Sequence, residues 1–216
     1  MNTTTLAAVI VMVVLAAIFA VFVLRREQLP QIKNVFVPFD RMLVFTVLFL
    51  PVIIIVMYTL QGTRFDSLTL FRRSILLFFG YIVSVEDFKT KRIPNGFVLG
   101  MMAVWLFSAV PQLFMDTEAG VAYLISAGLG FLVGGGLFLL VYFISKRGLG
   151  GGDVKFMAAA GLYLGLNGVL PVMLYGSVLS AIVGIALILL KRLGRKDAMP
   201  LAPFLYIGIL ITMLML

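Results

Sequence analysis

The sequence predicts an all-α membrane protein, a polytopic bundle of about eight transmembrane helices. Hydrophobic residues make up 62% of the 216-residue chain and charged residues only 12%, whereas soluble domains have about 45–50% apolar and about 25% charged residues. The apolar residues also form separate runs, most of them near the roughly 20 residues that a helix needs to cross a bilayer. Short segments rich in Lys and Arg separate several of these runs.

The runs fall into an N-terminal pair and a larger C-terminal set. Residues 1–66 contain two expected helices joined by a short loop, and residues 67–216 contain the other six. The fifth run has Gly130 and Gly134 four residues apart, a spacing that favours close contact between membrane helices. The eight expected spans are residues 5–24, 42–60, 68–86, 96–114, 121–144, 153–166, 169–190 and 200–216.

The distribution of positive charge predicts the orientation of the chain. Lys and Arg are enriched in the cytoplasmic loops of membrane proteins. With eight spans, every Lys and Arg except Arg64, Arg72 and Arg73 falls on one side of the membrane. We therefore expect a multi-pass protein of the cell membrane, with both termini outside. The net charge of +8 is explained by this pattern, and no basic stripe interleaved with aromatics suggests nucleic-acid binding.

The chain contains no Cys and no His. Thiolate nucleophiles, Ser-His catalysis and zinc sites built from Cys or His are therefore excluded. Acid–base chemistry must come from the nine Asp and Glu residues, from Lys or from Tyr. We accordingly expect neither a metal nor a cofactor.

Two acids are expected at the same membrane face. Asp87 ends the third run and Asp153 begins the sixth, directly after Gly150, Gly151 and Gly152. Two carboxylates brought close in a partly dry site cannot both ionise easily, so one can act as general base and the other as general acid. Taken singly, each acid has a simpler explanation. Asp153 could be a helix N-cap, and Asp87 could form an ion pair with the neighbouring basic residues.

Four motifs follow one another along the chain. Asp87 is followed after five residues by Ile-Pro-Asn at 93–95, residues 150–155 read Gly-Gly-Gly-Asp-Val-Lys, and two further segments lie at residues 158–165 and 200–205. In this order they resemble the motifs of the type IV prepilin peptidase family of GxGD aspartyl proteases, with residues 150–155 fitting its GxGD signature. The resemblance covers about residues 74–216, and it implies that residues 67–216 form a six-helix peptidase core.

The resemblance implies a membrane-embedded endopeptidase that removes a short basic leader from prepilin-like, single-span precursors at the cytoplasmic edge of the bilayer. Asp87 and Asp153 would be its catalytic pair. Bifunctional members carry a cytoplasmic insertion with zinc-binding cysteines between the first two spans, and that insertion is associated with N-methylation. This chain has only residues 25–41 there and no Cys, so we expect no zinc site and no methyltransferase activity.

Further residues are expected to support this site, and their alternatives stay open. Gly150 and Gly152 would let the backbone approach the substrate, and Lys155 would either anchor a phosphate group or tune the pKa of Asp153. Glu86 could raise the pKa of Asp87 or meet the basic leader, but it could equally balance Lys89 or Lys91. The other two expected supporting residues are Pro94 and Asn95.

Other functions are compatible with parts of the pattern. A presenilin-like protease shares the GxGD signature but is not expected to have the Ile-Pro-Asn segment. A proton-coupled transporter would place its acids near mid-membrane, whereas Asp87 and Asp153 lie at the ends of runs. A purely structural membrane subunit is the third alternative. The sequence does not specify the oligomeric state.

Overall fold

The computed structural model describes residues 55, 65–145, 148–191, 194 and 199–215. The chain divides into two compact units, residues 1–74 and 75–216, and the candidate site lies entirely in the second. The two predicted N-terminal spans, apart from Ile55, fall outside the described residues.

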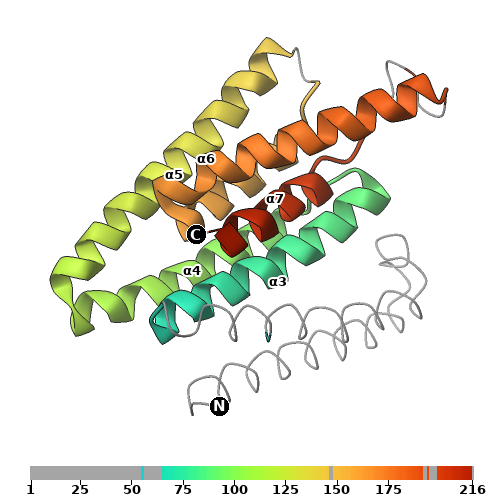
Figure 1. Ribbon diagram of the computed structural model, residues 1–216. Helices are drawn as coiled ribbons and strands as arrows, with labels where there is room; N and C mark the ends of the chain where they lie inside the picture. Colours follow the sequence, from blue (N-terminus) through green and yellow to red (C-terminus); the bar gives the residue numbers. More distant parts are fainter. Residues whose placement is uncertain (1–54, 56–64, 146–147, 192–193, 195–198, 216) are drawn as a thin grey trace, which may run out of the picture. The chain divides into compact units, whose positions relative to one another are not determined.

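All regular structure in the described part is helical, as predicted (Figure 1). Four helices are long and apolar enough to cross a membrane: α3 (Ser67–Thr90), α4 (Asn95–Met115), α5 (Thr117–Ile144) and α6 (Gly151–Leu189). The fifth, α7 (Ala202–Met215), is apolar but shorter. The described residues thus contain five helices and do not confirm the count of eight.

Two predicted loops are mostly helix in the structure. Residues 87–95 were expected to form a loop, but α3 continues to Thr90 and Asp87 lies in its last turns. Lys91 ends the helix with a positive φ of 52°. The expected loop at residues 115–120 is also wrong, since α5 follows α4 after Asp116 alone, whose carboxylate caps α5 by accepting the Ala119 N–H at 3.0 Å. Polar and charged residues continue these helices beyond their apolar runs, so hydropathy ended α3 too early and began α5 too late.

Helix α6 turns back on itself at Gly165. In a straight helix Met157 and Val169 would lie roughly 18 Å apart. Here a Cβ built on Gly134 of α5 would lie 2.7 Å from the Met157 carbonyl oxygen and 2.8 Å from Val169 Cγ2. Gly165 has φ 64° and ψ −174°, a conformation that essentially only glycine adopts. The turn was predicted at Asn167–Gly168, and the structure places it at Gly165 instead.

Glycine also allows α5 to contact α6 backbone to backbone. A Cβ on Gly130 would collide with the Gly161 carbonyl oxygen, and a Cβ on Gly161 would collide with the Gly130 carbonyl oxygen. Gly134 meets the Met157 carbonyl. The predicted contact role of Gly130 and Gly134 is therefore confirmed, and α6 is the partner. Figure 1 shows α5 and α6 side by side.

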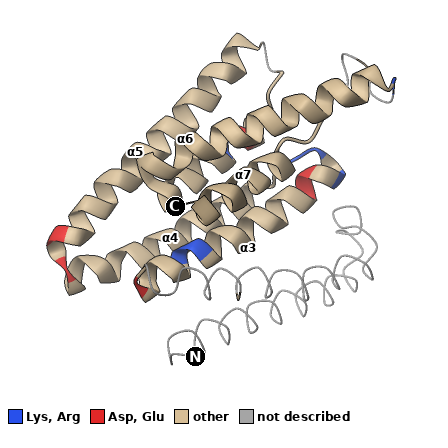
Figure 2. Cartoon of the chain, viewed as in Figure 1, with Lys and Arg blue, Asp and Glu red and all other residues tan. Residues whose placement is uncertain are grey.

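The charged residues lie toward the helix ends, with long uncharged stretches between them (Figure 2). Inside the second unit, side-chain hydrogen bonds join the helices within those uncharged stretches. Trp105 Nε1 of α4 donates to the Tyr123 hydroxyl of α5 at 2.7 Å, and the Tyr163 hydroxyl of α6 donates to the Met101 carbonyl of α4 at 2.6 Å. These bonds satisfy polar groups that the bilayer interior cannot hydrate.

Candidate active site

The carboxylate of Asp87 is buried near the end of α3, with 5% of its surface exposed. Its Oδ2 accepts the backbone N–H of Ala202, the first residue of α7, at 3.0 Å. The N–H groups at a helix start lack intrahelical partners and carry partial positive charge, so they favour a carboxylate. Asp87 is thus fixed by a contact between residues 115 positions apart in the chain.

Asp153 lies in the first turn of α6 and is 7% exposed. Its backbone N–H donates to the Gly150 carbonyl at 3.1 Å. Its Oδ1 atom is buried and has no hydrogen-bond partner among the described residues. A buried carboxyl oxygen without a partner is costly, so Asp153 is poorly explained as a helix cap alone.

The structure brings the two predicted acids together. Asp87 and Asp153 are close enough for the charge on one to act on the other. The segment before α4 also contacts the glycine loop, the glycine-rich residues 148–152 that run into the start of α6. A Cβ on Gly152 would lie 2.9 Å from Ile93 Cβ. The end of α3 and the start of α6 therefore form one buried site with two carboxylates.

The glycines of this loop provide space rather than unusual backbone angles. Gly165 is the only glycine with positive φ among the described residues, and Gly150 has φ −72°. A Cβ on Gly150 would lie 2.7 Å from Asp153 Oδ2, and one on Gly152 would press on Ile93. Gly151 has nothing within 4 Å of its added Cβ. Gly150 and Gly152 thus make room for the Asp153 carboxylate and for the loop that precedes α4.

We expect Gly152→Ala to destabilise the protein and Gly151→Ala to leave it nearly unchanged. The alanine methyl at 152 must displace Ile93, whose backbone N would also be only 3.4 Å away, and such overpacking costs about 1–3 kcal/mol. Thermal unfolding of the two purified variants in the same detergent would measure the difference. Equal unfolding temperatures for both variants would contradict the packing role of Gly152.

Lys155 and Asn95 interact with each other instead of with the acids. Lys155 Nζ donates to Asn95 Oδ1 at 3.0 Å. Because successive helix residues are rotated by about 100°, Lys155 lies on nearly the opposite side of α6 from Asp153. The bond joins the start of α4 to the start of α6. Lys155 thus connects the Ile-Pro-Asn segment at residues 93–95 with the motif at residues 150–155.

Glu86 and Pro94 also have defined places. Glu86 is 1% exposed and interacts electrostatically with Lys89, which agrees with the alternative in which it balances a nearby lysine. Pro94 precedes the first residue of α4 with φ −64° and ψ 132°, an extended conformation that proline favours. It therefore marks the start of α4, where a missing N–H costs nothing.

The start of α7 is the part of the site that sequence reasoning missed. The sequence of residues 200–205 shows a resemblance to the family but predicts no role for them at the site. In the structure the Ala202 N–H holds Asp87, and the Ala202 carbonyl accepts the Ser84 hydroxyl of α3 at 3.1 Å. The prolines at 200 and 203 could have indicated that a helix starts here, because proline is favoured in the first turn of a helix.

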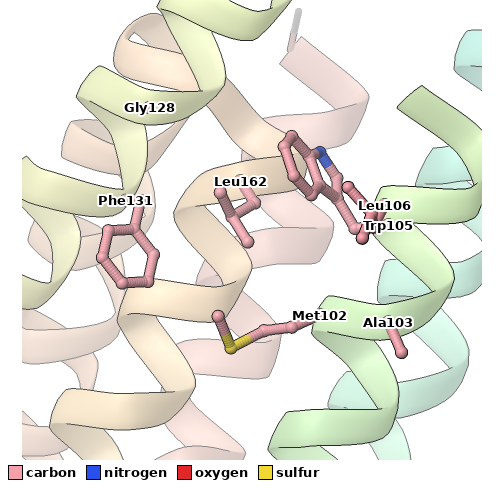
Figure 3. A pocket seen from close by; sticks show the side chains of 7 residues that line it. All are labelled: Met102, Ala103, Trp105, Leu106, Gly128, Phe131 and Leu162. Atoms are coloured by element: carbon pink, nitrogen blue, oxygen red, sulfur yellow. The ribbon is translucent and has the colours of Figure 1, made fainter. Parts of the chain in front are cut away.

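A hollow of about 400 Å³ lies among α4, α5 and α6 (Figure 3). Its lining is apolar and includes Trp105, Phe131 and Leu162. A neighbouring hollow shares Met102 and Phe131 with it and reaches Lys155 and Asn95. Leu162 is nine residues from Asp153, which places it on the opposite side of α6. These hollows therefore lie on the side of α6 that faces away from the two carboxyl groups.

Within the described residues, no group of three or more His, Cys, Asp or Glu side chains could hold a metal ion. The carboxyl groups buried at the candidate site are those of Asp87 and Asp153 and that of Glu86, next to Asp87 in the chain. A pair of carboxyl groups can exchange protons with a water molecule and with a peptide group.

Comparisons with known proteins show the family to which the chain belongs. Residues 74–185, just over half of the chain, match the model of the type IV leader peptidase family. A prepilin leader peptidase/N-methyltransferase of Bacillus subtilis is 28% identical over 159 residues, which cover 73% of this chain and 61% of that protein. Proteins with the same name from Xanthomonas campestris and Aeromonas salmonicida are 29% and 38% identical, over 62% and 39% of this chain and 46% and 29% of theirs.

The chain thus spans about half the length of the curated relatives that it matches. No solved structure matches it. The family match contains both acids, the Ile-Pro-Asn segment and the Gly165 turn, all within residues 74–185. From this match, and from the apolar helices that carry it, we conclude that the chain is a multi-pass membrane protein of the type IV leader peptidase family.

Proposed function

We propose that this protein is a membrane-embedded aspartyl endopeptidase that removes the short basic leader of prepilin-like precursors. The observation that supports the proposal is that Asp87 and Asp153, two buried carboxyl groups from separate helices, lie near enough to interact electrostatically. The family match supports the substrate class, since the matching relatives are named prepilin leader peptidases.

The reaction requires one carboxylate and one carboxylic acid. The carboxylate takes a proton from a water molecule while the water oxygen forms a bond to the scissile carbonyl carbon. The carboxylic acid then gives its proton to the leaving amine as the C–N bond breaks. Water is thereby added across the peptide bond. One carboxyl group gains a proton and the other loses one, so the number of protons on the pair is unchanged. A buried pair suits this division, because two adjacent carboxylates do not both ionise easily.

We place the site at the cytoplasmic face of the cell membrane. Asp87 is followed by Lys89, Lys91 and Arg92, and the glycine loop is preceded by Lys146 and Arg147. Such basic segments favour the cytoplasmic side. The acids also lie near helix ends, which supports a protease acting at the membrane edge more than a transporter with acids at mid-membrane. We expect the lipid bilayer to surround the protein, and we expect no nucleic-acid partner.

We also propose that the protein cleaves without methylating. The expected loop between the first two spans is short and the chain has no Cys, so this chain cannot form a cysteine zinc site. The relatives are named for both activities, so the two must be assayed separately.

The direct test uses the full chain reconstituted in lipid vesicles with a precursor that has one apolar segment preceded by a short basic leader. We expect the leader to be released, with no transfer of label from a radioactive methyl donor to the new N-terminus. One of the matching relatives, assayed in parallel, shows that the precursor is competent. An intact precursor under those conditions would refute the peptidase assignment, and labelling of the product would refute the absence of methylation.

A further inference from the structure

Ser84 lies one turn before Asp87 on α3 and is 6% exposed. Its hydroxyl is within hydrogen-bonding distance of two carbonyl oxygens, that of Gly80 at 2.6 Å and that of Ala202 at 3.1 Å. A serine hydroxyl has a single proton to donate, so these two carbonyls share it. The first bond stays within α3, whereas the second reaches the start of α7.

Ala202 is therefore held by α3 through both of its backbone polar groups. Its carbonyl accepts from Ser84, and its N–H donates to Asp87 Oδ2 at 3.0 Å. The next residue, Pro203, has no N–H. At the start of α7, Asp87 is therefore served by the backbone N–H of Ala202, at 3.0 Å, together with that of Leu201, the residue before it. The two bonds to Ala202 are made by side chains three residues apart on one face of α3.

The surrounding packing keeps α7 against α3. The rings of Tyr81 and Tyr206 meet edge to face with centroids 6.1 Å apart. A Cβ on Gly80 would lie 3.0 Å from the ring of Tyr206. Figure 1 shows α7 running alongside α3. With the helices already in contact, the Ser84 hydroxyl adds a polar bond from α3 to the Ala202 carbonyl, in the first turn of α7.

We propose that Ser84 is a positioning residue for the peptidase reaction. By holding the Ala202 carbonyl, it keeps the Ala202 N–H on Asp87 Oδ2, and so it fixes the orientation of that carboxyl group. Ser84 does not touch the reacting atoms. The inference rests on the proposed function, because a fixed Asp87 matters only if Asp87 is one of the catalytic pair.

Ser74 provides a matched control on the same helix. It is 1% exposed, and its hydroxyl donates to the carbonyl four residues earlier, Leu70, at 2.8 Å. Ser84 makes the equivalent bond to Gly80 and in addition reaches α7. Ser74→Ala therefore removes a buried helix-internal bond alone, whereas Ser84→Ala removes such a bond together with the bond to Ala202.

The test compares Ser84→Ala, Ser84→Thr and Ser74→Ala in the full chain in vesicles. We expect Ser84→Ala to lower kcat roughly five- to tenfold, about the effect of one hydrogen bond, with KM unchanged. Ser84→Thr keeps a hydroxyl that can bond to backbone carbonyls and should restore most of the rate. Ser74→Ala should cleave at nearly the wild-type rate.

Hydrogen–deuterium exchange gives a readout that is independent of activity. In Ser84→Ala we expect faster exchange in the peptide covering residues 199–206, where every residue except Pro200 and Pro203 carries a backbone N–H group. Exchange in α5 should not change. Ser74→Ala should leave residues 199–206 at the wild-type rate.

Unchanged exchange at residues 199–206 in Ser84→Ala would overturn the inference, and so would a kcat that falls no further than in Ser74→Ala. The proposed function fails in a different way, because the wild-type chain would then not cleave the precursor at all. Faster exchange in Ser84→Ala alongside an inactive wild type would show that Ser84 holds α7 but does not serve a peptidase, which also overturns the positioning role.

Discussion

Replacement of Asp87 or Asp153 by Asn is expected to slow leader cleavage by a factor on the order of 10²–10⁴, the usual contribution of a general acid or base. Asn has nearly the same shape as Asp but can neither accept nor release a proton in this reaction. Each single variant should therefore lose most of the activity, because both proton transfers are needed. The rate of precursor cleavage in vesicles is the measurement.

Asp116→Asn is the matched control for these variants. Asp116 is an exposed acid that caps α5, and Asn caps helices about as well as Asp. We expect Asp116→Asn to cleave at the wild-type rate. The assignment of Asp87 and Asp153 as the catalytic pair would be wrong if either Asn variant cleaved at a rate comparable to that of Asp116→Asn.

Gly130→Ala is expected to cause the largest loss of stability among single methyl additions to α5. The new Cβ would collide with the Gly161 carbonyl oxygen and would lie 2.7 Å from the Gly165 carbonyl carbon. These are backbone atoms, so the contact cannot be relieved by a change of rotamer, and α5 and α6 must separate. We expect a loss of about 3 kcal/mol, the upper part of the range for overpacking.

Gly136→Ala on the same helix is the control, because nothing lies within 4 Å of its added Cβ. Alanine has the higher helix propensity, so this variant should be as stable as the wild type or slightly more stable. Thermal unfolding in one detergent compares the two. Similar unfolding temperatures would mean that α5 and α6 do not meet at Gly130 in the folded protein.

Much of the fold could be predicted from hydropathy and charge, because these follow directly from the bilayer environment. The apolar runs at 68–86, 96–114 and 121–144 correspond to α3, α4 and α5. The small residues Gly130 and Gly134 correctly marked a helix contact. The sequence could not identify its partner, since packing between distant segments leaves no periodic signal in one chain.

The prediction failed where local chemistry competes with hydropathy. Asp87, Lys89 and Thr90 are polar or charged, yet they continue α3, because buried contacts and the bond from Ala202 stabilise the last turns. The turn in α6 was placed at Asn167–Gly168, a common turn sequence. It lies at Gly165, where a Cβ would be 2.5 Å from the Ser126 hydroxyl oxygen, and this contact is visible only in the folded chain.

By itself, the sequence determined the class of protein and singled out Asp87 and Asp153 as candidate catalytic acids. Composition and hydropathy, which are properties of the chain alone, indicated the class and placed both acids at the ends of apolar runs, and the resemblance of the surrounding motifs selected them. The tertiary structure decided which groups surround those acids. It placed the Ala202 N–H on Asp87, paired Lys155 with Asn95, and assigned Gly150 and Gly152 to making space. These are contacts between segments distant in the chain, and only the packing of the helices against one another determines them.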